Sequence, residues 1–169
     1  MPKQVAECKE VQWMEGPTPD EVRIVGMSTV AAAHTVYVET VRKMFGEKGL
    51  EALAEANRLH GLELGEQGVK DGGLRKGDLR SIYEFFAAAF PFFGFVIEEP
   101  EVSDHRIDLK VTGCPWIDTF HAKNANEDIC HWVTKIDEGI GQAVDPKLSM
   151  TIPKCMMRGD DYCIYRFER

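Results

Sequence analysis

The spacing of apolar residues changes near Pro91, and this change constrains the fold more than any other feature of the sequence. From Ser28 to Phe90 apolar residues recur every three or four positions, which is the spacing of one face of a helix. Beyond Pro91 they alternate with polar residues, most clearly between His105 and Val111. We therefore expect an α+β fold, in which N-terminal helices pack on a roughly four-stranded antiparallel sheet of two hairpins with an intervening helix.

Capping and stop signals set the expected helix boundaries. Ser28 and Asp78 are residues of the N-cap type, and Pro91 cannot continue a regular helix. Gly61 and Gly65 lie one turn apart, so another helix can approach the second helix closely there. The expected helices span about 28–45, 50–70 and 78–90, with a fourth from residue 126 or 128 to about 143.

Turn residues divide the second half of the chain into strands. The strands are expected at about 93–98, 105–111, 147–157 and 162–168, with turns at 99–101 and 158–161. The 169 residues fit one domain of ordinary size. Within it we distinguish an extended lead-in at 1–20, a helical part at 21–90, and a sheet-plus-helix part at 91–169 that carries the expected site.

Composition limits the classes of partner. The net charge of −8 disfavours nucleic acid and anionic membrane surfaces, which leaves a small-molecule ligand as the expected partner and a homo-oligomer as an open alternative. The first residues are polar and the apolar runs are too short to span a bilayer, so a cytoplasmic location is expected.

The chain has five cysteines, an odd number that argues against a disulfide framework. No CxxC pair occurs, so a zinc ribbon is not indicated. Free thiols are therefore expected. A metal site built from Cys114, Cys130 and Cys163 with a histidine or water remains an alternative, although the sequence requires no cofactor. The roles of Cys8 and Cys155 are left open.

The fourth expected helix places a thiol and an acid on one side. Cys130 and Asp137 are seven residues apart, nearly one above the other at the edge of an apolar face, whereas His131 points away. Cys114 follows the second strand in a Gly-Cys-Pro-Trp turn, where a helix beginning at Pro115 would lower the thiol pKa. Without such a helix, Cys114 would pack against Trp116.

The walls of a pocket are expected from two further places. In the last strand Cys163, Tyr165 and Phe167 share the inward face, and the loop length at 158–161 decides whether Cys155 joins them. Three histidines fall on inward faces, of which His34, with Tyr37 one turn later, is the preferred functional one; the other two are His60 and His105.

The C-terminal half resembles a known family. The Gly113-Cys114-Pro115 element, the helix with Cys130 and Asp137, and the ending Gly159-Asp160-Asp161-Tyr162-Cys163 resemble the L-2-amino-thiazoline-4-carboxylic acid hydrolase-like family over residues 90–168. The ending is also similar to small-molecule-binding domains of the four-vinyl-reductase type. The family places an acid about three residues after the helical cysteine, where this chain has Val133.

The resemblance implies hydrolytic opening of a small cyclic C–N or C=N bond. That reaction needs a nucleophile, a proton donor for the leaving nitrogen and a group that binds a carboxylate. Cys114 or Cys130 would be the nucleophile if its thiolate is stabilised, and Asp137 or Asp160 would move protons. Asp160 has a competing role, because an aspartate in a tight turn often binds its own backbone. The alternatives are a non-catalytic binding module and a metal-binding protein.

Overall fold

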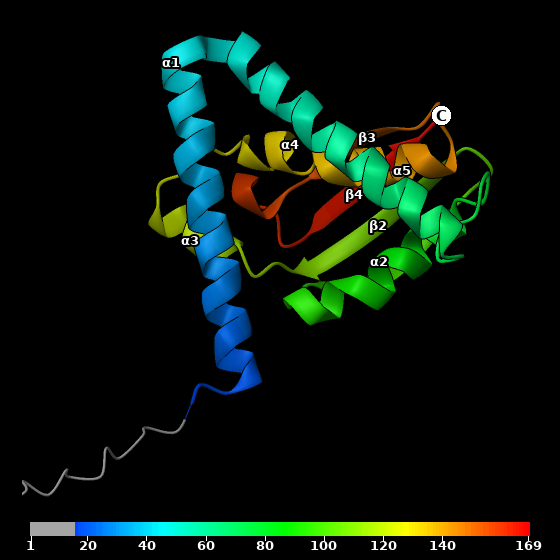
Figure 1. Cartoon of the computed structure of the whole chain (residues 1–169), viewed down its shortest axis with the longest axis horizontal. Helices are drawn as coiled ribbons and strands as arrows, with labels where there is room; N and C mark the ends of the chain where they lie inside the picture. Colours follow the sequence, from blue (N-terminus) through cyan, green and yellow to red (C-terminus); the bar gives the residue numbers. More distant parts are fainter. Residues whose placement is uncertain (1–15) are drawn as a thin grey trace, which may run out of the picture.

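The structure is a computed structural model that describes residues 16–169, and it has helices packed on one face of a four-stranded antiparallel sheet (Figure 1). The α+β fold expected from the sequence is therefore confirmed. Most of the predicted lead-in, and Cys8 with it, lies outside the described residues.

The first element is a long helix, α1 (Pro19–Lys70), which changes direction at Gly46 (Figure 1). Gly46 has φ 63°, a conformation that glycine adopts without steric penalty, so two helical arms meet there without a loop. The expected N-cap at Ser28 is wrong. The helix begins at Pro19, where Thr18 and Glu21 cap each other reciprocally, and a proline fits the first turn because no N–H is needed there.

The second helix, α2 (Arg80–Phe93), continues through Pro91 instead of stopping there. A proline in the last turn removes one hydrogen bond but leaves the following residues free to stay helical. The helix ends at Gly94, whose φ of 88° turns the chain back so that the Phe95 N–H donates to the Phe90 carbonyl at 3.1 Å. This turn brings the two phenylalanines together.

The sheet has the order β1-β2-β4-β3, so two hairpins meet through the pairing of β2 with β4. Across that pair Leu109 lies opposite Tyr165 and Val111 lies opposite Cys163. The predicted inward face of Cys163, Tyr165 and Phe167 is confirmed, since these residues are buried. The four strands are β1 (Val96–Val102), β2 (Arg106–Gly113), β3 (Ser149–Lys154) and β4 (Cys163–Glu168).

The turn expected at residues 99–101 is wrong, because these residues belong to β1. Glu98 pairs with Lys110 and Glu101 with Asp108, so the two residues between them, Glu99 and Pro100, bulge out of the pairing. A proline is tolerated there because β1 is an edge strand and its N–H is not required. The hairpin turn lies at residues 103–105, where the Ser103 N–H donates to the Arg106 carbonyl.

The single fourth helix expected from the sequence is also wrong. The segment contains α4 (Ile129–Val133) and α5 (Lys135–Val144), separated at Thr134, after a short helix α3 (Ile117–Ala122). Thr134, with φ −81° and ψ 4°, leaves the helical conformation and is both the C-cap of α4 and the N-cap of α5; its hydroxyl donates to the Cys130 carbonyl at 2.6 Å. Cys130 and Asp137 therefore lie on two different helices.

The second arm of α1 lies directly against α5, as the glycines predicted (Figure 1). A Cβ atom added at Gly61 would lie 1.9 Å from the Ile136 carbonyl oxygen, and one added at Gly139 would lie 2.0 Å from the Arg58 carbonyl oxygen. The backbones touch at this crossing, which leaves no freedom for α5 to shift. The first turn of α5, with Asp137, is positioned by this contact.

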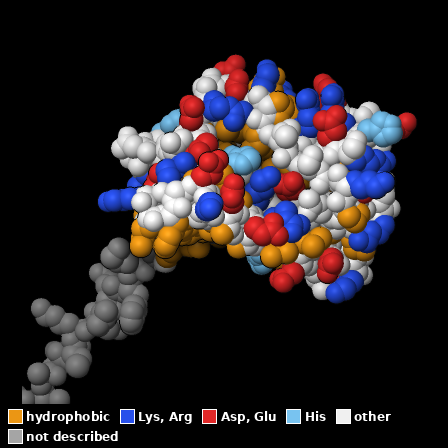
Figure 2. Space-filling model, turned by 90° about the horizontal axis from the view of Figure 1, so that it is seen from above, with side chains coloured by type: hydrophobic (Ala, Val, Ile, Leu, Met, Phe, Trp, Pro, Cys, Tyr) orange, Lys and Arg blue, Asp and Glu red, His pale blue; other side chains and the backbone are white. Residues whose placement is uncertain are grey.

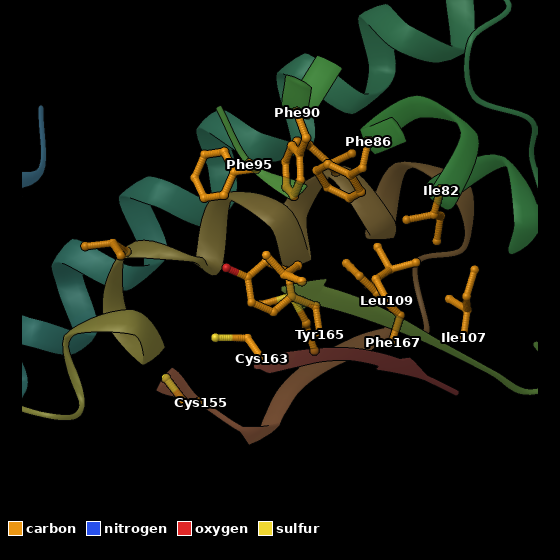
Figure 3. Close-up of a cluster of buried hydrophobic side chains, with 14 of the residues drawn as sticks. Ile82, Phe86, Phe90, Phe95, Ile107, Leu109, Cys155, Cys163, Tyr165 and Phe167 are labelled. Atoms are coloured by element: carbon orange, nitrogen blue, oxygen red, sulfur yellow. The ribbon is translucent and has the colours of Figure 1, made fainter. Parts of the chain in front are cut away.

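The hydrophobic core fills the space between the helices and the inner face of the sheet (Figure 3). Phe86 of α2 stacks on Phe167 of β4, with ring centroids 6.3 Å apart. Ile107 and Leu109 of β2 are fully buried beside them. Among residues 16–169, no helix is both long enough and apolar enough to cross a bilayer.

Candidate functional site

A pocket of about 250 Å³ opens between α1, α2, α5 and the end of β4, and we call it the Asp137 pocket. Eight of its eleven lining residues are apolar, and the two that can ionise are Asp137 and Tyr165. Such a lining is typical of a binding site for small molecules with apolar bodies. The lining residues are Met27, Val30, Phe90, Phe93, Phe95, Trp116, Val133, Thr134, Ile136, Asp137 and Tyr165.

One wall of the pocket is aromatic. The ring of Phe95 lies 4.8 Å from that of Phe90 and 5.4 Å from that of Trp116, measured between centroids. Phe95 reaches this place because Gly94 reverses the chain at the end of α2, and Trp116 comes from the Gly-Cys-Pro-Trp segment after β2. Two chain turns thus bring aromatic rings from separate elements into one row.

The mouth of the pocket lies on an apolar part of the surface. Phe93 and Val30, which line the pocket, are 50% and 41% exposed. Figure 2 shows apolar side chains gathered next to the point where the described chain begins, and Val22, Ile24 and Val25 of the first turns of α1 are exposed there. A ligand would therefore meet apolar surface before it enters.

Asp137 is the buried acid of the pocket. Its side chain is 9% exposed, and no hydrogen bond or charge within residues 16–169 offsets this burial. Burial alone raises the pKa of the carboxyl group to about 7. The group is thus about half ionised at neutral pH, and it faces a pocket instead of a protein partner.

Tyr165 separates the Asp137 pocket from the cysteines. Figure 3 shows its ring between Phe95 and Cys163 in that view. Burial raises the pKa of its phenol well above the usual value, and the charges of Asp137 and the neighbouring thiols raise it further. Tyr165 therefore remains a neutral hydrogen-bond donor over the physiological pH range.

Cys155 and Cys163, which are buried and labelled in Figure 3, form a group of their own with the half-buried Cys130. Cys155 accepts hydrogen bonds from the thiols of Cys130 and Cys163, which lowers its pKa far below the usual range of a thiol and raises the pKa of the two donors. Cys155 is fully buried, and none of the four described cysteines lines the Asp137 pocket. This cluster brings together Cys130 and Cys163, as the sequence suggested, but its centre is a residue whose role the sequence left open.

The position of Cys155 follows from its hydrogen bonds with the following turn. Its N–H donates to the Asp160 carboxylate at 2.8 Å, and the Met156 N–H donates to the Cys163 sulfur at 3.3 Å. The single 3₁₀ turn η1 (Met156–Arg158) and Gly159, with φ 86°, close this loop. Asp160 therefore binds the backbone of its own turn, the alternative that the sequence left open, and stands outside the Asp137 pocket.

Cys114 is not activated as a nucleophile. Its sulfur accepts hydrogen bonds from the N–H groups of Trp116 and Ile117, as expected beside the start of a helix. Burial outweighs this effect and raises the thiol pKa to about 11. The stabilised thiolate that the nucleophilic role requires is disfavoured at Cys114 and also at Cys130.

A metal centre finds no support in the described part of the chain. Within residues 16–169, no three His, Cys, Asp or Glu side chains are arranged so that they could hold a metal ion. The three-cysteine site considered from the sequence is not formed there, because the thiols of Cys130 and Cys163 are turned to Cys155 as hydrogen-bond donors.

His34 and Tyr37 lie behind the pocket wall and do not line it. The imidazole of His34 packs edge-on against Trp116 and Tyr37, with centroids 5.0 Å and 5.3 Å away, and burial lowers its pKa. The expectation that His60 and His105 face inward is wrong, since both are exposed. His60 lies within α1 on its solvent side, and His105 lies in the turn that precedes β2.

Several residues that shape the pocket had no role in the sequence-based site. Trp116 was considered only as a packing partner of Cys114, Phe90 and Thr134 were expected in helices, and Phe95 was expected in a strand. The aromatic clustering on either side of Gly94 was the available signal. It could not distinguish a core from a pocket, because both are lined by the same residue types.

The fold and site define a class of α+β protein in which helices and an antiparallel sheet enclose an apolar pocket with one buried acid. The chain belongs to the L-2-amino-thiazoline-4-carboxylic acid hydrolase family, whose family model matches residues 27–167. The match extends beyond residues 90–168, where the sequence located the resemblance, into helix α1.

The fold also occurs in a solved structure of another protein. A trafficking protein particle complex subunit 3 from Naegleria fowleri, covalently bound to palmitic acid, has a TM-score of 0.57 and 16% identity, with 85% of this chain and 95% of that chain covered. At this identity the similarity shows the fold alone. No curated protein shows significant similarity to the sequence.

Proposed function

We propose that this protein binds a small molecule with a largely apolar body in the Asp137 pocket. The observation that carries the proposal is the pocket itself, in which eight apolar side chains surround a single acid that has no partner among the described residues. A protein that used these residues only for its core would gain stability by filling the cavity and by replacing the acid.

Two comparisons support an apolar ligand. The trafficking protein particle complex subunit of the same fold is covalently bound to palmitic acid, so this fold accommodates a long apolar group in that protein. The family's name refers to a hydrolase of a small heterocycle, which supports a small molecule as the ligand here.

A fluorescent apolar dye tests the proposal. N-phenyl-1-naphthylamine, which is neutral, should increase in fluorescence on titration with the protein and should bind at one site. Val30→Trp should abolish this binding, because Val30 lines the mouth and the larger ring fills the pocket. Val36→Trp is the matched control, since Val36 is 61% exposed on the same helix and does not line the pocket. Equal binding by the two variants, or no binding by the unmodified protein, would contradict the proposal.

Hydrolysis of the bound molecule is a second candidate, which the pKa of Asp137 favours. A carboxylate with a pKa of about 7 can take a proton from water while the water oxygen bonds to an amidine-like carbon. Asp137 then passes this proton to the ring nitrogen. When the C–N bond breaks and the carbon–oxygen bond becomes a carbonyl, the second proton of the water passes to the same leaving nitrogen. This route uses Asp137 as the base and needs no thiolate at Cys114 or Cys130.

The two candidates are separated by turnover. Incubation with 2-amino-thiazoline-4-carboxylate, followed by mass spectrometry, should detect the ring-opened carbamoyl-cysteine if the protein is a hydrolase for this substrate class. Its rate should then rise with pH through about 7 as Asp137 ionises and should be lost in Asp137→Asn. If the dye binds and no turnover is detected, the protein binds small molecules without hydrolysing this substrate.

A further inference from the structure

We propose that the Asp137 pocket selects ligands that carry a positively charged nitrogen, as an ammonium or amidinium group, on an apolar body. This inference rests on the proposed binding function and specifies its ligand class. It is argued from the charge of the pocket, from its aromatic lining and from the charge of the whole chain.

The pocket contains a buried acid and no basic side chain, so a cationic ligand would balance its charge. No lysine, arginine or histidine is among the lining residues, and Asp137 receives no hydrogen bond from the described part of the protein. A buried carboxylate without a partner is unfavourable, and a ligand N–H that donates to it removes that penalty. A ligand carboxylate placed directly against Asp137 would be repelled by it.

The aromatic lining favours the same ligand class. Five of the eleven lining residues are aromatic, and three of them form the row in which Phe95 lies between Phe90 and Trp116. Aromatic rings attract a cation through their negative faces, and this attraction increases when the cation is removed from water. An acid beside several aromatic rings is the combination that binds ammonium groups in other proteins.

Charges near the mouth do not oppose a cation. Arg23 lies beside Met27 and Phe93 in the adjacent hollow, and its guanidinium pairs with Asp20 at 3.0 Å. The net charge of the whole chain is −8, which raises the local concentration of cations at the surface.

Binding of a cation should strengthen as the pH rises. Asp137 is mostly neutral at pH 5.5 and mostly ionised at pH 8, because its pKa is about 7. Among the groups that face it, Tyr165 of β4 stays neutral, and α1, α2 and the Trp116 segment contribute no titratable side chain to the lining. His34, behind Trp116, has a lowered pKa and is neutral at pH 8.

A matched ligand series tests the proposal by isothermal titration calorimetry. The probes are 3-phenylpropylammonium, 3-phenyl-1-propanol and 3-phenylpropionate, which share one apolar body and differ in the charge of one end. At pH 8 the ammonium probe should bind roughly tenfold or more tightly than the alcohol, since a charged hydrogen bond replaces a neutral one. This preference should shrink at pH 5.5.

Variants of the protein identify the group responsible. Asp137→Asn should bind the ammonium and the alcohol with similar affinity, whereas Asp118→Asn, a change at an exposed residue outside the pocket, should keep the preference. Alcohol or propionate binding as tight as ammonium binding in the unmodified protein would overturn the ligand class while leaving the binding function in place. Failure of all three probes and of the neutral dye would overturn the binding function itself.

Discussion

Asp137 combines burial with the absence of a protein partner, and this makes it a source of pH-dependent stability. In the unfolded chain an aspartate has a pKa of about 3.9, whereas in the folded protein the pKa is about 7. Between these values the folded state holds a proton that the unfolded state has lost. The stability that Asp137 contributes is therefore complete below about pH 4 and is lost as the pH rises to about 7.

Replacement of Asp137 by asparagine should remove this dependence. Between pH 5 and pH 8 the free energy of unfolding of the unmodified protein should fall by on the order of 3 kcal/mol, because Asp137 stays protonated only in the folded state over the two pH units below its pKa. Asp137→Asn should not show this fall, since asparagine does not ionise. Urea unfolding at the two pH values measures the change. Asp118→Asn, at an exposed site, should show the same pH dependence as the unmodified protein. A variant that loses equal stability at both pH values would show that Asp137 has a structural partner.

At the scale of elements, the crossing of α1 and α5 determines where the pocket acid lies. The two backbones meet at Gly61 and Gly139 without space for a Cβ atom. A shift of α5 would carry both Asp137 and Thr134 away from the pocket. The glycines therefore position the site without touching a ligand.

Adding a single methyl group at this crossing should destabilise the fold. Gly61→Ala should lower the free energy of unfolding by about 3 kcal/mol, because the new Cβ would overlap the Ile136 carbonyl, which is backbone and cannot rotate away. Gly26→Ala is the control in the same helix, where no atom lies within 4 Å of the added Cβ. That variant should gain up to about 1 kcal/mol from helix propensity. Similar unfolding midpoints for the two variants would show that the crossing is loose.

At the scale of the whole molecule, the cysteine group is enclosed by parts of the chain that are distant in sequence. Cys130 comes from α4, Cys155 from the loop after β3 and Cys163 from β4. A reagent reaches Cys155 only when these parts separate, since its side chain is fully buried. The hydrogen bonds with Cys130 and Cys163 that lower its pKa are lost when these parts separate, so the exposed Cys155 reacts as an ordinary thiol.

Alkylation should consequently report on opening of the fold. Iodoacetamide should modify Cys155 and Cys163 slowly in the native protein and quickly above the urea transition, with sites assigned by peptide mass spectrometry. Gly61→Ala should accelerate the native reaction and Gly26→Ala should not. Rapid modification of Cys155 in the unmodified native protein, at a rate independent of urea below the transition, would instead identify an accessible reactive thiol.

The amino-acid sequence by itself determined the fold class, the inward face of β4 and the close approach at Gly61. These three features follow from the spacing of apolar residues or from the size of a residue, and both can be read within a few neighbouring positions of the chain. The family resemblance also followed from short motifs, and the family match extends it over residues 27–167.

Only the tertiary structure decided which side chains meet. The pairing of β3 with β4 shifts register between Thr151 and Lys154, which brings Cys155 to Cys163. The break at Thr134 assigns Cys130 to the thiol group and Asp137 to the pocket. The physical reason is that register, helix breaks and pocket walls depend on packing between segments far apart in the chain, which no local pattern encodes.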